Sequence, residues 1–149
     1  LIMLVYGASV AVGNIYGGKL ADKKGPIRAL TIIFSALAVI LFALTFTMGS
    51  KLAAVITVLV WGAFAFGNVP GLQVYVVQLA EKFTPNAVDV ASGLNIAAFN
   101  IGIALGSIIG GAIVDGMQLS DTAWVGALIS VAALVVTRFS GHLDKRALA

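Results

Sequence analysis

The chain has 149 residues, of which 60% are hydrophobic and 10% charged, with a net charge of +3 and no cysteine. Soluble proteins place charge on about a quarter of their residues, so this composition excludes an ordinary soluble domain. The lack of cysteine excludes a disulfide framework and thiolate metal sites. The small net charge argues against a nucleic-acid partner.

Five apolar segments without charge follow one another along the chain, at about 1–18, 29–48, 52–80, 90–114 and 122–137. A helix needs about 20 apolar residues to cross a bilayer, so each segment predicts a transmembrane helix. The predicted fold is therefore all-α, a polytopic membrane helix bundle over residues 1–149. The third segment exceeds the bilayer thickness and contains Pro70, which predicts a kink or a strong tilt. Because Leu1 already lies in an apolar run, we expect the chain to begin within a longer protein.

The basic residues favour one side of the predicted membrane. Eight of the nine fall in the first loop, the third loop and the tail, and only Lys51 falls in the second loop. Cytoplasmic loops carry an excess of Lys and Arg, which predicts that loops 19–28 and 81–89 and the C-terminus are cytoplasmic.

Residues 17–28, Gly-Gly-Lys-Leu-Ala-Asp-Lys-Lys-Gly-Pro-Ile-Arg, form a charged connection between the first two segments. Their order resembles the signature loop of the major facilitator superfamily of secondary transporters. The resemblance implies a cytoplasmic gating loop that latches two transporter halves through Gly18, Asp22, Gly25 and Arg28. We expect Asp22 to lie at a helix start, where the helix dipole favours an anion. The alternative is a solvated loop whose lysines only set the topology.

Segments 60–79 and 91–111 also look like the tenth and eleventh helices of the superfamily's drug:proton antiporter group, in its arabinose-efflux-permease-like branch. The resemblance implies that the five predicted helices correspond to helices 8–12 of a twelve-helix fold, without the N-terminal half. A match to the first half would place an arginine in the third segment, and residues 52–80 contain none.

Polar side chains within the membrane gather on the third and fourth segments. Amides facing lipid are costly, so these side chains should face the bundle or a water-filled cavity. We expect a substrate cavity formed by Trp61, Asn68, Gln73, Tyr75, Asn95 and Asn100. Hydrogen bonding between helices is the alternative role. Gly102, Gly106 and Gly110 recur every four residues, which favours close helix packing.

The chain contains no nucleophile–base pair, phosphate loop or metal-ligand cluster, so we expect neither an enzyme nor a cofactor. We expect a fragment of an efflux permease that moves a small organic solute, such as a drug, sugar or nucleoside, across the inner membrane. Its partners would be the lipid bilayer, the missing N-terminal half, the solute and a proton exchanged by antiport. The alternative is a non-transporting integral membrane protein with a packing or assembly role.

Overall fold

The computed structural model describes residues 2–146 as an all-helical bundle, and these residues contain no β-strand. The elements are α1 (Ile2–Lys24), α2 (Pro26–Thr47), α3 (Lys51–Phe83), a short 3-10 turn η1 (Pro85–Ala87), α4 (Val88–Gly116) and α5 (Asp121–Arg146). Their order and type confirm the predicted all-α bundle.

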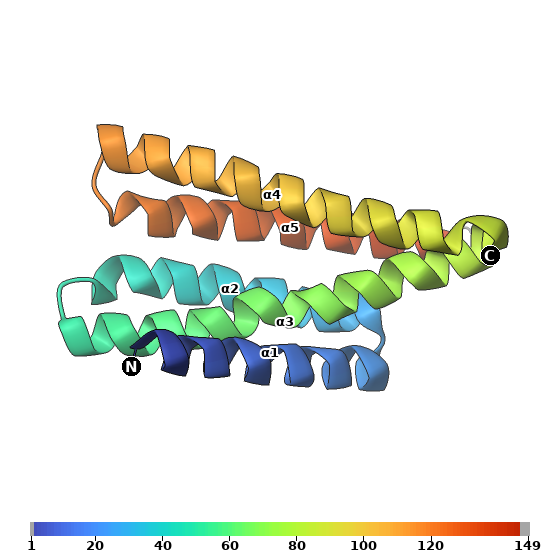
Figure 1. Cartoon of the computed structure of the whole chain (residues 1–149), viewed down its shortest axis with the longest axis horizontal. Coiled ribbons are helices and arrows are strands. Elements are labelled where there is room, and N and C mark those ends of the chain that lie inside the picture. Colours follow the sequence, from blue (N-terminus) through green and yellow to red (C-terminus); the bar gives the residue numbers. More distant parts are fainter. Residues whose placement is uncertain (1, 147–149) are drawn as a thin grey trace.

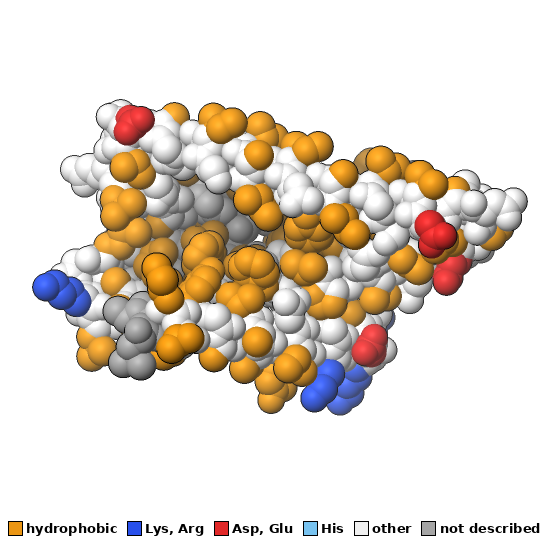
Figure 2. Space-filling model, in the orientation of Figure 1, with side chains coloured by type: hydrophobic (Ala, Val, Ile, Leu, Met, Phe, Trp, Pro, Cys, Tyr) orange, Lys and Arg blue, Asp and Glu red, His pale blue; other side chains and the backbone are white. Residues whose placement is uncertain are grey.

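Four of the five helices are long and apolar enough to cross a membrane: α2, α3, α4 with the preceding η1, and α5. Helix α1 is not among them in the part of the chain that the structure describes, where every stretch of 18 of its residues includes Lys19 and Asn14 together with four glycines. The span predicted at residues 1–18 therefore stays a prediction. Figure 2 shows apolar side chains spread over the length of one face, with a few charged side chains at its margins. Such an exposed apolar surface suits a bilayer and not water.

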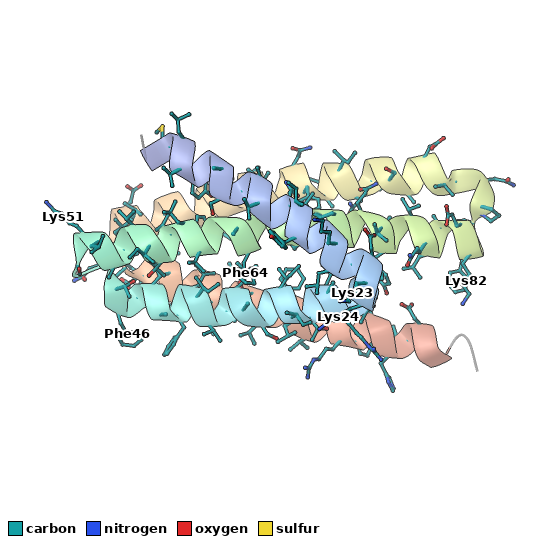
Figure 3. The ribbon with its side chains drawn as sticks, turned by 90° about the horizontal axis from the view of Figure 1, so that it is seen from below. Lys23, Lys24, Phe46, Lys51, Phe64 and Lys82 are labelled. Carbon is teal, nitrogen blue, oxygen red and sulfur yellow. The ribbon has the colours of Figure 1, made fainter. Side chains whose placement is uncertain are left out.

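The helices run roughly along one long axis, and their connections alternate between its two ends (Figure 1). The turn at Gly25, η1 and the end of α5 lie at one end, which we call the basic end. Figure 3 shows Lys23, Lys24 and Lys82 toward this end and Lys51 at the other. The connections are thus separated in space as the topology prediction requires.

Helix α2 forms the centre of the bundle. Its buried residues Leu30, Ile33, Phe34 and Leu37 recur at the three- and four-residue spacing of one helix face. Side chains of α3 and α5 pack against this cluster, among them Trp61, Phe64 and Leu134. Helix α4 lies at the edge, and the described residues bury none of its side chains.

Helices α1 and α3 approach each other through small residues. A Cβ atom on Gly13 would lie 1.9 Å from the Ala63 carbonyl oxygen, and one on Gly17 would lie 2.0 Å from that of Gly67. One turn earlier, the Ser9 hydroxyl donates a hydrogen bond to the Leu59 carbonyl. The backbones are therefore in direct contact over about two turns, as small residues permit between membrane helices.

Two predicted boundaries were wrong. Only Gly25 separates α1 from α2, so the predicted loop 19–28 is mostly helical. Helix α5 continues to Arg146, well beyond the predicted end at residue 137. Lys and Arg are good helix formers, so the loss of apolar character marks the end of the hydrocarbon layer and not the end of the helix.

The break at Gly25 has a local cause. Gly25 adopts φ 80° and ψ 153°, a region essentially restricted to glycine, and Pro26 follows as the first residue of α2. Proline is favoured at a helix start because its missing N–H has no helical partner there. Within α3, by contrast, the helix continues through Pro70.

Candidate functional site

A chain of amide hydrogen bonds joins α3 to α4. The Gln73 Nε2 atom donates to Ser92 Oγ at 2.6 Å, and Asn95 Nδ2 donates to Gln73 Oε1 at 2.7 Å. All three side chains are half-buried. Because α4 makes few other contacts with the bundle, these bonds are its main polar attachment to α3.

A hollow of about 360 Å³ lies beside this amide chain. Asn95 lines it together with Leu72 from α3 and Phe99, Gly102 and Ile103 from α4. A Cβ atom on Gly102 would meet nothing within 4 Å, so the glycine leaves the wall open. Asn95 therefore combines a bond that orients its amide with a position at the surface of a hollow, an arrangement that can bind a polar solute.

The predicted stripe Trp61, Asn68 and Tyr75 does not share this hollow. Trp61 packs against the α2 cluster, with its ring centroid 6.3 Å from that of Tyr6. The Tyr75 hydroxyl donates to Asp144 Oδ2 at 2.6 Å and lies 2.8 Å from Ser140 Oγ, both on α5. Within the described part of the chain, Trp61 and Tyr75 thus join helices.

Asn68 makes a different contact. Its Nδ2 atom donates to the Ala65 carbonyl of its own helix at 2.9 Å. Its Oδ1 atom is buried and has no partner among the residues that the structure describes. Such an acceptor is costly to leave unpaired, so it is available to a bound water or to a hydroxyl of a solute.

Two other predictions fall on the open face of α4. Asn100 is exposed, and its Nδ2 atom donates to the Ile96 carbonyl one turn earlier. Cβ atoms on Gly102, Gly106 or Gly110 would meet nothing within 4 Å. These glycines have no packing partner between residues 2 and 146, so their packing role stays a prediction.

The glycines that do pack lie elsewhere. Gly13 and Gly17 on α1 meet α3, and Gly71 on α3 lies against Leu30 of α2. The sequence contains two pairs of small residues spaced four apart, Gly13 with Gly17 and Ala63 with Gly67, a spacing that permits close helix packing. This signal marks the α1–α3 contact that our sequence analysis did not identify.

The signature residues cluster around the Gly25 turn. Gly18 faces Pro70 of α3, since a Cβ atom on Gly18 would lie 3.8 Å from the proline Cβ. Asp22 and Arg28 are both exposed, one on the last turn of α1 and the other on the first turn of α2.

The prediction that Asp22 lies at a helix start was wrong. Helix α1 continues past it to Lys24, and Gly25, the residue before α2, makes no side-chain cap. At a helix C-terminus the dipole favours cations, which suits the neighbouring Lys23 and Lys24 and does not favour the Asp22 carboxylate.

Comparisons with known proteins find the same class of membrane protein. The chain is 54% identical over 146 residues to a protein of Bacillus subtilis (strain 168) named uncharacterized MFS-type transporter YtbD, a match that covers 98% of this chain and 37% of the relative. It is 34% identical over 144 residues to the inner membrane transport protein YdhP of Escherichia coli (strain K12), covering 95% of this chain and 35% of that protein. No family model and no solved structure matches.

A third relative, the uncharacterized MFS-type transporter YfhI of Bacillus subtilis, is 30% identical over 149 residues, covering 97% of this chain and 35% of its own length. These matches show that the chain belongs to the major facilitator superfamily and is part of an integral, multi-pass membrane protein. The three relatives are named as transporters and not as enzymes, in agreement with the sequence analysis. The chain spans about a third of their length.

Proposed function

We propose that this chain is part of a secondary transporter that moves a small organic solute across the bacterial inner membrane. The observation that carries the proposal is the Gln73–Asn95 amide pair beside a hollow in an otherwise apolar surface. The relatives' names support transport, and the name of the Escherichia coli relative supports the inner membrane.

The amides suit solute binding for an energetic reason. A polar group within the hydrocarbon layer is costly unless it is hydrogen-bonded or faces water. Gln73 and Asn95 satisfy part of their hydrogen-bonding capacity with each other, and Asn95 also lines the hollow. Secondary transporters bind solutes near the midplane and expose the site alternately to the two sides. We assign Gln73 and Asn95 to the wall of such a site.

Efflux by proton antiport is the finer part of the proposal. The carboxylates of α4, Asp89 and Asp115, lie near the two ends of that helix, and the other four acidic residues also lie near helix ends: Asp22, Glu81, Asp121 and Asp144. A proton-coupling carboxylate at mid-membrane depth would therefore belong to a part of the transporter outside this chain. The same applies to the partner of Asp22, which we assign with Gly18, Gly25 and Arg28 to a cytoplasmic latch between transporter halves.

The test measures transport of a panel of related solutes by the full-length protein and its variants. Gln73→Ala and Asn95→Ala should each change the affinity unequally across the panel, because a deleted hydrogen bond matters only to a solute that uses it. Ser107→Ala on the same helix is the control, since this hydroxyl bonds the Ile103 carbonyl of its own helix and belongs to no candidate site, and it should change no preference.

Asp22→Asn tests the latch in the same assay. It should lower transport of every solute alike, because it alters the balance between access states and not the solute contacts.

The proposal fails if Gln73→Ala and Asn95→Ala leave every preference unchanged. A change in solute preference caused by Asp22→Asn would contradict the latch. Normal membrane insertion without transport of any solute would favour the packing or assembly role.

A further inference from the structure

Two adjoining hollows open between α1 and α2 near the basic end. One, of about 440 Å³, is lined by Lys23, Lys24, Arg28, Thr31 and Ile32. The other, of about 460 Å³, has an apolar lining that includes Val12, Tyr16, Leu20, Ile32 and Phe64. Ile32 lines both, so the basic hollow and the apolar one adjoin at this residue. We call the combined feature the α1–α2 groove.

The groove follows from how α1 is packed. Its glycines bring α1 directly against α3, whereas α1 makes far fewer contacts with α2. The wedge left between α1 and α2 is bordered by exposed apolar side chains, and Ile32 is 41% and Tyr16 67% exposed. From Val12 to Leu20 the apolar part extends about 12 Å along α1, at ~1.5 Å per residue.

The charges of the groove have one sign. Three of the five residues lining its basic part carry positive charge, and no residue lining either part is acidic. Lys19 adds a cation at the border, since its Nζ lies 5.6 Å from the centroid of the Tyr16 ring. The groove thus combines several cations near the basic end of the bundle with an apolar hollow that extends toward the middle of α1.

We propose that the α1–α2 groove binds an anionic phospholipid. The phosphate lies against Lys23, Lys24 and Arg28, and one acyl chain occupies the apolar part beyond Ile32. Basic pockets between membrane helices attract anionic head groups, and arginine in particular matches the geometry of a phosphate. A soluble anion would use the basic part alone, so the apolar continuation favours a lipid.

The experiment uses the full-length protein in vesicles of phosphatidylcholine with a minor fraction of phosphatidylglycerol. Spin-labelled forms of the two lipids report the preference of the protein surface for the anionic one. The wild-type protein should prefer phosphatidylglycerol. Lys23→Gln combined with Lys24→Gln should reduce this preference at least about 5-fold, the effect expected of a single cation worth ~1 kcal/mol near the membrane surface. The control, Lys51→Gln with Arg138→Gln, removes the same charge at residues that line neither hollow and should retain the preference.

A second variant tests the acyl chain without changing any charge. Ile32→Trp fills the junction of the two hollows and should also reduce the preference, whereas Val39→Trp places the same ring on the outer face of α2 and should not. Soluble glycerol phosphate should not displace the labelled lipid. The proposal is overturned if the wild-type protein shows no preference. It is equally overturned if the controls act like the groove variants, or if glycerol phosphate competes.

Discussion

Gly17 of α1 meets Gly67 of α3 so closely that a Cβ atom on Gly17 would lie 2.0 Å from the Gly67 carbonyl oxygen. The obstructing atom belongs to the backbone, so no side-chain rotation can relieve the clash. Gly13 meets Ala63 in the same way one turn earlier. These contacts set the distance between α1 and α3, and the position of α1 in turn opens the groove toward α2.

Gly17→Ala should therefore force α1 away from α3. Overpacking usually costs ~1–3 kcal/mol, and the cost should be at the upper end because two backbones must separate. Thermal unfolding of the full-length protein in detergent should show a clear fall in Tm. Gly7→Ala on the same helix is the control, since a Cβ atom there would meet nothing within 4 Å. Equal effects of the two substitutions would contradict the close contact.

Gly25→Ala should destabilise the turn between α1 and α2 through the backbone alone. A Cβ atom at Gly25 has open space around it, but φ 80° with ψ 153° is strained for any residue with a side chain, at a cost of ~1–3 kcal/mol. Gly49→Ala in the turn between α2 and α3 tests the same change without a positive φ and should cost less. Chemical unfolding of both variants in detergent gives the comparison, and a harmless Gly25→Ala would refute the strained turn.

Tyr75→Phe should weaken the contact between α3 and α5. The substitution retains the ring and removes the hydroxyl that bonds Asp144 and Ser140, a loss of ~1–3 kcal/mol in the free energy of unfolding. A double-mutant cycle with Asp144→Ala isolates the pair. The coupling should fall within ~0.5–3 kcal/mol, as for residues in direct contact. Additive effects would show that the two side chains do not interact in the folded protein.

The charge distribution predicts the orientation of the bundle. A reporter inserted at Asn86, or fused after Ala149, should be cytoplasmic, and reporters at Ser50 and Ser120 should be outside. Eight of nine basic residues support this assignment. An external reporter at Asn86 together with a cytoplasmic one at Ser50 would reverse it.

The helices were predictable because burial in lipid demands long apolar stretches, and such stretches are legible in one sequence. Their ends were less predictable. The segment from Lys19 to Lys24 contains the charged residues of α1 and is still helical. The apolar stretch therefore ends several residues before the helix does.

The candidate site was predictable only as a set of residue types. The sequence identified Gln73 and Asn95 as costly amides, but their pairing depends on how α3 and α4 are rotated about their axes. The same rotation directs Tyr75 to α5 and Trp61 to the α2 cluster, away from the hollow beside Asn95. These rotations are set by packing between helices, so they cannot be predicted from the pattern of apolar residues in a single segment.

The one-residue joint at Gly25 also couples the depths of two helices. One residue of extended chain spans at most ~3.6 Å, so α1 and α2 have almost no slack with which to slide past each other along the membrane normal. A bilayer that becomes thicker or thinner must then shift or tilt the two helices together. The lysines at the end of α1 and the arginine at the start of α2 would keep a common height above the hydrocarbon layer in membranes of different thickness.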